Sequence, residues 1–311
     1  MKTVEYTFRS ATQICDIYAC EYLPDNSDVR AVVVINHGMA EHQGRYRDFI
    51  EYLVSCGYAV FMHDMANHGK SNQDFSQSGY FGSKDGWKNL VKDLNTNFER
   101  AKSAFPDKKI IVLGHSMGSF VARCFAAKRT VDGPDAVIFM GTGGSNPAAP
   151  VGDLLSGIVA SLKGELYKSP LLDKLTFGSY NNKFEKRTAF DWLTRDNDIV
   201  DKYIADKYCG FLFSAKGMND LVKLNISANS DEWYSKLPKE LKILLISGEM
   251  DPVGNYSKGI KEIYEKLVKT GHLKTQLKLF ADARHEVLNE TNKDEVYTCI
   301  RDFIEEAAEL K

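Results

Sequence analysis

Short apolar runs alternate with longer amphipathic segments along most of the chain. Eight runs have the length and composition of β-strands, and they cover residues 4–9, 14–23, 31–35, 58–62, 110–113, 136–140, 241–248 and 275–280. Apolar positions at helical spacing fall between them, around residues 46–56, 87–105 and 120–127. The first two runs are expected to pair antiparallel, whereas strands that alternate with helices are typical of a parallel sheet covered on both faces. The pattern therefore predicts an α/β fold with a mostly parallel, eight-stranded sheet.

The alternation breaks between the sixth and seventh predicted strands. Residues 145–235 are mixed and largely helical, without a clear parallel strand. We therefore predict a core made of residues 1–144 and 236–311, with a mainly helical cap of residues 145–235 inserted after the sixth strand. Within the cap, apolar residues recur at helical spacing at Val151, Leu154, Leu155, Ile158, Val159 and Leu162. This stripe fits a helix packed on the cap's own core, and it also fits a lid helix that lines a pocket or touches a lipid aggregate.

A G-x-S-x-G pattern fills residues 114–118, between the strand run at 110–113 and a segment with helical spacing. In a strand–turn–helix junction of this kind the serine has a strained backbone, and its hydroxyl stands clear of the sheet. Glycines on both sides suit a place where strand and helix pack too closely for a Cβ atom. The alternative is a structural serine in a tight turn. We predict that Ser116 is a nucleophile.

A nucleophilic serine needs a base, and the base needs a carboxylate that orients it. At such junctions the chain order is Ser, then Asp or Glu, then His. Asp251 lies just beyond the strand run at 241–248, and His285 lies just beyond the run at 275–280. Ligands and chemistry collect at the carboxyl ends of the strands in open parallel sheets. We therefore predict a triad of Ser116, Asp251 and His285.

Other residues compete for these roles. Glu249 and Asp282 are nearby carboxylates, but a proline directly after Asp251 fixes the turn there and favours Asp251. His272 follows a glycine in what resembles a loop at the end of a helix, where we expect it to be solvated.

The oxyanion of an acyl-transfer reaction is usually held by two backbone amides, one after the nucleophile and one beyond the third strand. These positions correspond to the N–H groups of Met117 and Met39. The neighbouring His37 also fits a simple turn, and both interpretations can hold because the donors are main-chain groups. Glu41 and Arg45 lie four residues apart and are expected to pair as structural bracing beside this loop.

Five segments together resemble the monoacylglycerol lipase and lysophospholipase group of α/β-hydrolases, which is often classed with the serine aminopeptidase family. They are residues 37–46 (HGMAEHQGRY), 63–71 (HDMANHGKS), 114–118 (GHSMG), 247–255 (SGEMDPVGN) and 283–290 (ARHEVLNE). The segments occur in the family's order and extend over most of residues 30–300. The resemblance implies an α/β-hydrolase fold and a serine hydrolase that acts on lipid-like acyl esters without a cofactor.

The chain departs from the family pattern in places. Ser119 stands where a glycine usually follows GHSMG, and Asn67 replaces a loop glycine; neither position has a predicted catalytic role. Residues 145–235 do not match the lid of the eukaryotic members, so the substrate remains open. Our candidate substrate-binding residues are His37, Leu155, Val159, Phe211 and Val253.

Composition and charge reduce the number of protein classes that fit this sequence. The net charge of −2 gives no field that would draw nucleic acid or an anionic membrane. The first ten residues lack the apolar stretch of a signal peptide, and no apolar run approaches the length of a membrane span. The six cysteines form no C-x-x-C pair and fall mostly in apolar patterns, as reduced core residues do. We therefore expect a cytoplasmic protein with no metal site and no stable membrane insertion.

These observations favour an esterase that cleaves a small-molecule acyl ester through an acyl-enzyme, with at most transient lipid contact through the cap. One alternative is an aminopeptidase for short peptides, which would need an anionic group for the substrate's ammonium; Asp191, Asp196 or Glu165 could supply it. A second alternative is a non-catalytic receptor for a small apolar ligand, although a receptor has no need of a complete Ser-Asp-His set.

Overall fold

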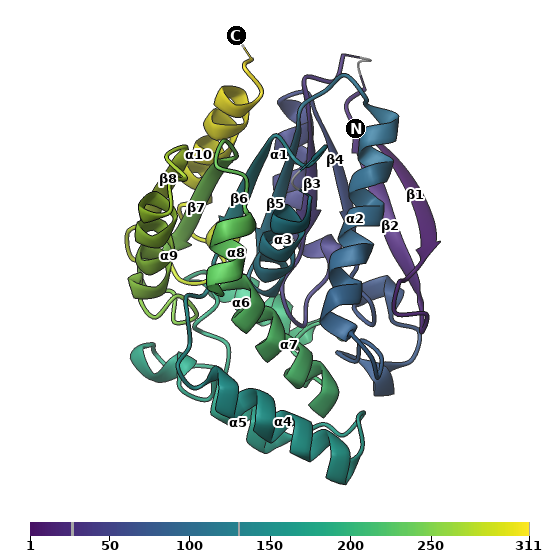
Figure 1. Cartoon of the computed structure of the whole chain (residues 1–311), viewed down its shortest axis with the longest axis vertical. Helices are drawn as coiled ribbons and strands as arrows, with labels where there is room; N and C mark the ends of the chain where they lie inside the picture. The colour runs from purple at the N-terminus through teal and green to yellow at the C-terminus, as the bar shows by residue number, and fades with distance from the viewer. Residues whose placement is uncertain (26–27, 130, 311) are drawn as a thin grey trace.

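A computed structural model describes residues 1–25, 28–129 and 131–310, and it is built around one eight-stranded sheet (Figure 1). The strands run in the order β1-β2-β4-β3-β5-β6-β7-β8. Their bounds are β1 Lys2–Arg9, β2 Asp16–Leu23, β3 Ala31–Asn36, β4 Tyr58–His63, β5 Ile110–His115, β6 Ala136–Met140, β7 Lys242–Gly248 and β8 Thr275–Phe280. The β1–β2 and β2–β4 pairs are antiparallel, and the other five pairs are parallel. This arrangement confirms the predicted mostly parallel sheet.

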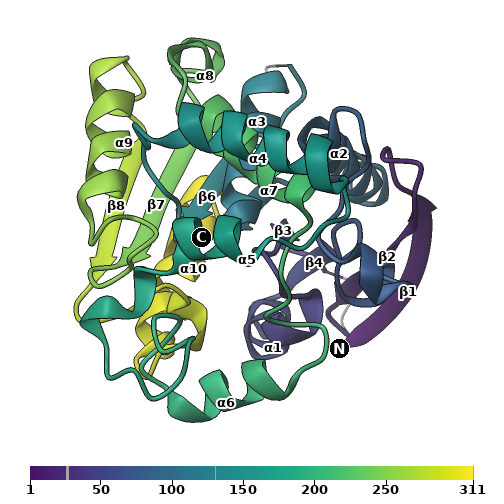
Figure 2. The ribbon, with the colours of Figure 1, turned by 90° about the horizontal axis from the view of Figure 1, so that it is seen from below.

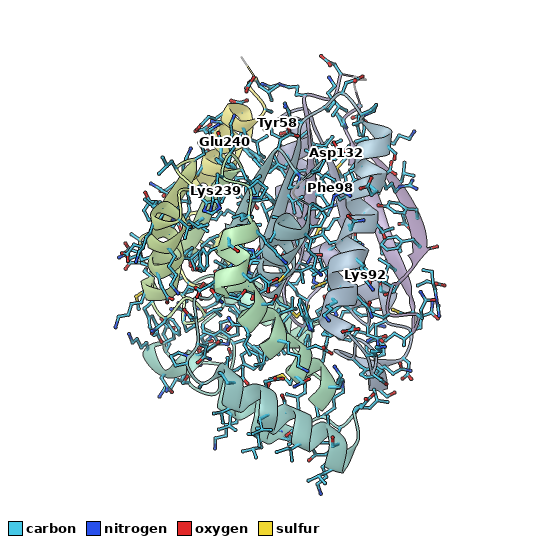
Figure 3. All side chains as sticks on the ribbon, viewed as in Figure 1. Tyr58, Lys92, Phe98, Asp132, Lys239 and Glu240 are labelled. Carbon is cyan, nitrogen blue, oxygen red and sulfur yellow. The ribbon has the colours of Figure 1, made fainter. Side chains whose placement is uncertain are left out.

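Helices cover both faces of the sheet and enclose two apolar cores. One face carries α1 (Arg47–Ser55) and α10 (Lys293–Ala307), and the other carries α2 (Gly86–Ala104), α3 (Met117–Lys128) and α9 (Lys258–Lys269). Tyr58 belongs to the core under α1 and α10, and Phe98 belongs to the core under α2, α3 and α9. Lys92, Asp132 and Lys239 lie exposed at the surface (Figure 3). Two buried faces explain why the central strands are apolar throughout rather than alternating.

The segment between β6 and β7 is helical, as its sequence predicts. It contains α4 (Ala149–Lys163), α5 (Pro170–Phe177), α6 (Asn197–Ala205), α7 (Ala215–Ala228) and α8 (Asp231–Lys236). Figure 2 shows α4 lying along α7, and α7 in turn packs on α3. Trp233 of α8 donates its indole N–H to the carbonyl oxygen of Arg123 on α3 at 2.7 Å. The second half of the segment is therefore continuous with the helical layer over the sheet, while α4 and α5 lie beyond the sheet's end (Figure 1).

The apolar stripe of α4 divides between two environments. Leu155 and Val159 pack against the core on the side of α7, whereas Val151, Leu154 and Leu162 are 67%, 66% and 78% exposed. Over the described ranges, no helix is both long enough and apolar enough to cross a membrane.

The expectation for His272 was wrong. The residue is fully buried, and its imidazole contacts the carbonyl oxygen of Leu237 at 3.0 Å and the hydroxyl of Thr270 at 3.0 Å. The loop after α9 turns back over the end of α8, so tertiary packing removes from solvent a residue that its local sequence places at the surface.

Candidate active site

Ser116 occupies the turn between β5 and α3, with φ 52° and ψ −122°. This left-handed backbone is strained for a residue other than glycine. A Cβ on Gly114 would overlap the carbonyl oxygen of Gly118, and a Cβ on Gly118 would overlap the carbonyl oxygens of Asn36 and His37 at the end of β3. Both glycines of the pattern are therefore required by the close packing of strand and helix, and this packing holds the serine in its strained turn.

Asp251 and His285 meet beyond the carboxyl ends of β7 and β8. His285 Nδ1 lies 3.0 Å from Asp251 Oδ1, and both side chains are almost completely buried. Asp251 Oδ1 also accepts the N–H of Val253 at 2.8 Å, and its Oδ2 accepts the hydroxyl of Ser247 at 3.1 Å. Burial alone would raise the pKa of Asp251, but the interaction with His285 and these two donors outweigh burial and lower it. The carboxylate is therefore held ionised, while Glu249 and Asp282 are exposed.

Ser116 and His285 both line a cavity of about 860 Å³, and so do Met39 and Met117. Within the described part of the chain, the backbone N–H groups of these two methionines donate to no other protein group. Free amides beside a serine are available to a ligand oxygen.

The candidate substrate-binding residues separate into two groups. Phe211 and Val253 line the cavity. Among the described residues, the lining does not include His37, Leu155 or Val159, so the structure does not support a pocket role for these three. His37 is fully buried and braces its loop by accepting the N–H of Met65 at 2.9 Å, and the two α4 residues face the core instead.

Sequence reasoning missed the groups that surround His285. The rings of Trp192 and His115 pack against the imidazole of His285, with centroid distances of 5.2 and 4.8 Å. Asp191, next to Trp192, accepts the N–H and hydroxyl of Thr188 and forms a hydrogen-bonded corner. Nothing in the local sequence singles out Trp192, because His285, the residue that its ring contacts, is distant along the chain.

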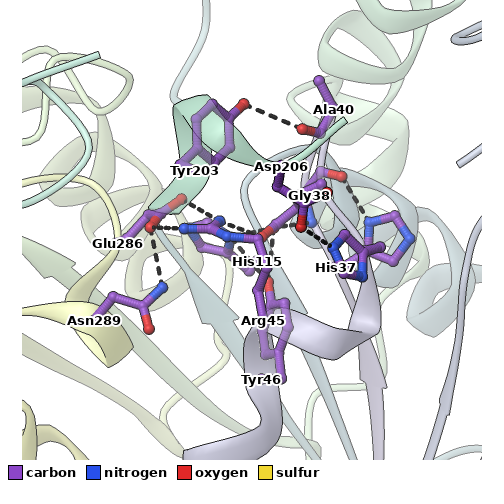
Figure 4. Close-up of polar contacts among 12 residues, drawn as sticks. His37, Gly38, Ala40, Arg45, Tyr46, His115, Tyr203, Asp206, Glu286 and Asn289 are labelled. Atoms are coloured by element: carbon purple, nitrogen blue, oxygen red, sulfur yellow. Dashed lines mark hydrogen bonds and ion pairs between the residues drawn. The ribbon is translucent and has the colours of Figure 1, made fainter. Parts of the chain in front are cut away.

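A buried charged cluster lies beside these residues (Figure 4). Arg45 pairs with Glu41 at 2.8 Å, as expected from their spacing, and also with Glu286, the residue after His285, at 2.6 Å. Tyr46 donates its hydroxyl to Glu41 Oε1 at 2.8 Å, and His115 Nδ1 lies 3.1 Å from the same oxygen. The cluster therefore links the loop after β3 to the loop after β8.

One group of described residues, His42, Asp206 and Cys209, brings possible metal ligands within 4.8 Å of one another. His42 Nδ1 accepts the N–H of Gly44 at 3.2 Å, which places the ring proton on Nε2, 2.8 Å from Asp206 Oδ2. A metal ligand needs that nitrogen unprotonated. The pair therefore acts as a hydrogen bond between the loop after β3 and the segment after α6.

The sheet, the strained serine turn and the carboxylate–imidazole pair beyond the later strands define an α/β-hydrolase. A family model described as "Serine aminopeptidase, S33" matches residues 27–292, and the chain belongs to this family.

Comparison with known proteins places the chain near esterases and monoacylglycerol lipases. It is 31% identical over 194 residues to a monoglyceride lipase homolog of Monkeypox virus, covering 61% of each chain. It is 27% identical over 208 residues to a monoacylglycerol lipase of Mycolicibacterium smegmatis, covering 65% of this chain and 64% of the relative. The matched segments thus span less than two thirds of the length of these relatives. A carboxyl esterase of Bacillus coagulans superposes with a TM-score of 0.92 at 28% identity, covering 99% of both chains.

Proposed function

We propose that this chain is a serine hydrolase that cleaves carboxylic esters of lipid-like substrates through an acyl-enzyme. The observation that carries the proposal is His285, which pairs with Asp251 at 3.0 Å and lines the same cavity as a serine in a strained strand–helix turn. Monoacylglycerols, lysophospholipids and simple carboxylic esters are the candidate substrates, and the names of the relatives support this class.

Each group has one role in the proposed reaction. His285 takes the proton of the Ser116 hydroxyl as that oxygen attacks the ester carbonyl carbon, and Asp251 holds the imidazole tautomer and stabilises the imidazolium. The amides of Met39 and Met117 donate to the tetrahedral oxyanion. The alcohol leaves with the proton from His285, and water then attacks the acyl-enzyme with the same base. No cofactor takes part.

Substitution of the nucleophile tests this proposal. Ser116→Ala should reduce ester turnover by about 10⁶-fold, because the members of a triad act as a unit. The assay follows hydrolysis of p-nitrophenyl esters and monoacylglycerols of increasing chain length, with a fluorophosphonate probe to label Ser116 in the parent. Undiminished turnover in pure, folded Ser116→Ala protein would overturn the assignment. A parent protein that the probe fails to label would favour the non-catalytic receptor instead.

The aminopeptidase alternative has less support. Asp191 accepts from Thr188, Asp196 caps α6 through the N–H groups of Asp198 and Ile199, and Glu165 accepts from two hydroxyls of a neighbouring loop. These three carboxylates are therefore occupied by hydrogen bonds within the protein, and among the described residues none of the three lines the cavity. Aminoacyl-nitroanilides, assayed beside the esters, decide between the two activities.

We further propose that α4 and α5 act as the lid of a cap formed by residues 145–235 and touch lipid aggregates. Leu154, Leu162 and Leu171 are between 58% and 78% exposed and give these two helices an exposed apolar surface, while Leu175, 63% exposed, also lines the cavity. Large exposed apolar faces mark interaction sites. A monomeric acyl ester needs no such face, whereas an ester held in a micelle or vesicle does.

A matched pair of leucines tests the lid face, because Leu162 and Leu273 are both 78% exposed. Leu162→Ser should slow hydrolysis of aggregated long-chain monoacylglycerol while leaving a soluble short-chain p-nitrophenyl ester unaffected. Leu273→Ser, which lies in the loop before β8, should leave both rates unchanged. Equal effects of the two substitutions would refute the lipid contact.

A further inference from the structure

Two elements of the proposed site have immediate chain neighbours that contact one carboxylate, Glu41. The N–H of Gly38, the residue before Met39, donates to Glu41 Oε1 at 2.5 Å. His115, the residue before Ser116, places its Nδ1 3.1 Å from the same oxygen. The loop that presents an oxyanion donor and the strand end that presents the nucleophile are thus both hydrogen-bonded to the buried side chain of Glu41; Figure 4 labels their contacting residues, Gly38 and His115.

Arg45 extends this connection to a third element. Its Nη1 lies 2.8 Å from Glu41 Oε2 and 2.6 Å from Glu286 Oε1, and its Nη2 lies 2.7 Å from Glu286 Oε2. Glu286 directly follows His285 in the chain. A two-pronged guanidinium–carboxylate contact fixes orientation as well as distance. The oxyanion loop and the histidine loop, 241 residues apart in sequence, are therefore joined by one fork-shaped contact.

The bridge is closed to solvent on its outer side. The side chains of Arg45, Glu41 and Glu286 are 10%, 4% and 4% exposed, and the ring of Tyr203 lies 4.7 Å from the guanidinium carbon. Burial alone would lower the pKa of Arg45, but the charges of Glu286 and Glu41 outweigh burial and raise it. A buried and fully paired bridge of this kind has one well-defined geometry, because any displacement leaves a charge without a partner.

We propose that Glu41, Arg45 and Glu286 are positioning residues, which hold the oxyanion amides and the His285 imidazole at the separation that the transition state requires. The inference rests on the proposed function, and it adds that the bridge acts on turnover rather than on substrate binding. Misplacement of a reacting group by about 1 Å can lower a rate about 100-fold. Mere bracing of the fold would not act on turnover in this selective way.

The chain offers a matched control on the same loop. Arg195 Nε lies 2.8 Å from Glu290 Oε2, where Glu290 is fully buried and also accepts the N–H of Arg284. This pair joins the cap segment to the histidine loop, as Arg45 and Glu286 join the oxyanion loop to it. In the part of the chain that the structure describes, neither side chain of this pair forms a hydrogen bond or ion pair with the oxyanion loop.

The experiment compares Arg45→Gln, Glu286→Gln and Arg195→Gln at a temperature where each is folded by circular dichroism. We expect kcat to fall about 10- to 100-fold in the first two, with KM within threefold of the parent, and to stay within threefold in Arg195→Gln. The Arg45→Gln/Glu286→Gln double variant should lose little more than either single variant, because the two side chains act through one contact. Arg45→Lys, which keeps the charge but loses the fork, provides a milder loss if Arg45→Gln does not fold.

The rate of fluorophosphonate labelling at Ser116 provides a second readout that needs no knowledge of the natural substrate. It should fall in parallel with kcat in the Arg45 and Glu286 variants. If Arg45→Lys and Glu286→Gln label and turn over as fast as Arg195→Gln, the positioning role is wrong while the proposed function stands. If the parent neither labels nor hydrolyses any ester, the proposed function fails, and this inference fails with it.

Discussion

Replacing Asp251 by asparagine should reduce turnover far less than the same change usually does in a triad. Oδ1 of this carboxylate accepts two N–H donors, from Val253 at 2.8 Å and from His285 at 3.0 Å. An asparagine must therefore place its oxygen there. Its amide nitrogen then takes the place of Oδ2, 3.1 Å from the oxygen of Ser247, whose hydroxyl has a second acceptor in the carbonyl of Gly248 at 3.3 Å. Every partner remains satisfied, and the ring proton stays on Nδ1.

The expected loss of kcat in Asp251→Asn follows from the one interaction that changes, the hydrogen bond between residue 251 and His285. A hydrogen bond to a charged group contributes about 1.5–3 kcal/mol, and a neutral one contributes about 0.5–1.5 kcal/mol. The difference of about 1–2 kcal/mol is lost in the transition state, where His285 is an imidazolium, and it corresponds to about 5- to 30-fold in kcat. Inversion of the histidine tautomer would instead reduce kcat about 10⁴-fold.

Hydrolysis of a soluble p-nitrophenyl ester distinguishes these outcomes. Asp251→Asn should retain much more activity than Asp251→Ala, and both are compared at a temperature where thermal unfolding shows them folded. Adding Ser247→Ala to Asp251→Asn removes the acceptor of the amide nitrogen and should lower kcat further, whereas Ser247→Ala alone should have a small effect. A loss of 10³-fold or more in Asp251→Asn would show that the amide is reversed and would refute the reasoning.

Three further outcomes are expected. Gly157→Ala should raise the free energy of unfolding of α4 by about 0.5–1 kcal/mol, because a Cβ there meets its nearest atom at an ordinary 3.8 Å; urea denaturation measures the change, and a decrease would contradict it. Gly118→Ala should lower stability by about 1–3 kcal/mol and reduce kcat as well, because the Cβ would overlap the backbone oxygens of Asn36, the last residue of β3, and of His37 directly after it. Burial lowers the pKa of His37 and His63 to about 4 and that of His68 to about 3, so the unfolded chain binds protons first as pH falls. Stability should therefore be full above pH 6.5 and decline towards pH 4, and unfolding midpoints unchanged over this window would contradict this expectation.

The parts of the fold that could be predicted are those with a local signal. Strand limits agree with the apolar runs to within two residues for all eight strands, and β6 and β8 agree at both ends. The sequence predicts Ser116, Asp251 and His285 because each combines a reactive side chain with a position beyond a strand, and parallel strands place their carboxyl ends together whatever the intervening sequence.

The parts that could not be predicted depend on which surfaces meet. Leu155 and Leu154 are adjacent and equally apolar, yet one packs on the core and the other is exposed, because the approach of α7 decides the buried side. The pairing of Arg45 with Glu286 spans 241 residues, and nothing in either local pattern indicates it. The sequence alone predicts only the pairing of Arg45 with the nearby Glu41. That pairing is present, but it leaves out the second partner of Arg45, Glu286.

The inserted segment between β6 and β7 has two parts that relate differently to the proposed site. One part bears on turnover, and the other bears on the choice of substrate. The carbonyl oxygen of Leu193 accepts the N–H of Glu286 at 2.7 Å, and that of Ala40 accepts the hydroxyl of Tyr203 at 3.1 Å and the N–H of Gly210 at 3.0 Å. The stretch from 193 to 210 is thus hydrogen-bonded to both the histidine loop and the oxyanion loop. Loss of these three contacts would disturb catalysis for every ester, whereas the side chain of Arg195 takes part in none of them. By contrast, α4 and α5 carry the exposed leucines, and α4 packs on α7, so we expect changes in these two helices to act on which esters reach the serine. Substrate preference within such a family can therefore change most easily through substitutions in α4 and α5, because these helices make none of the three contacts that fix the catalytic loops.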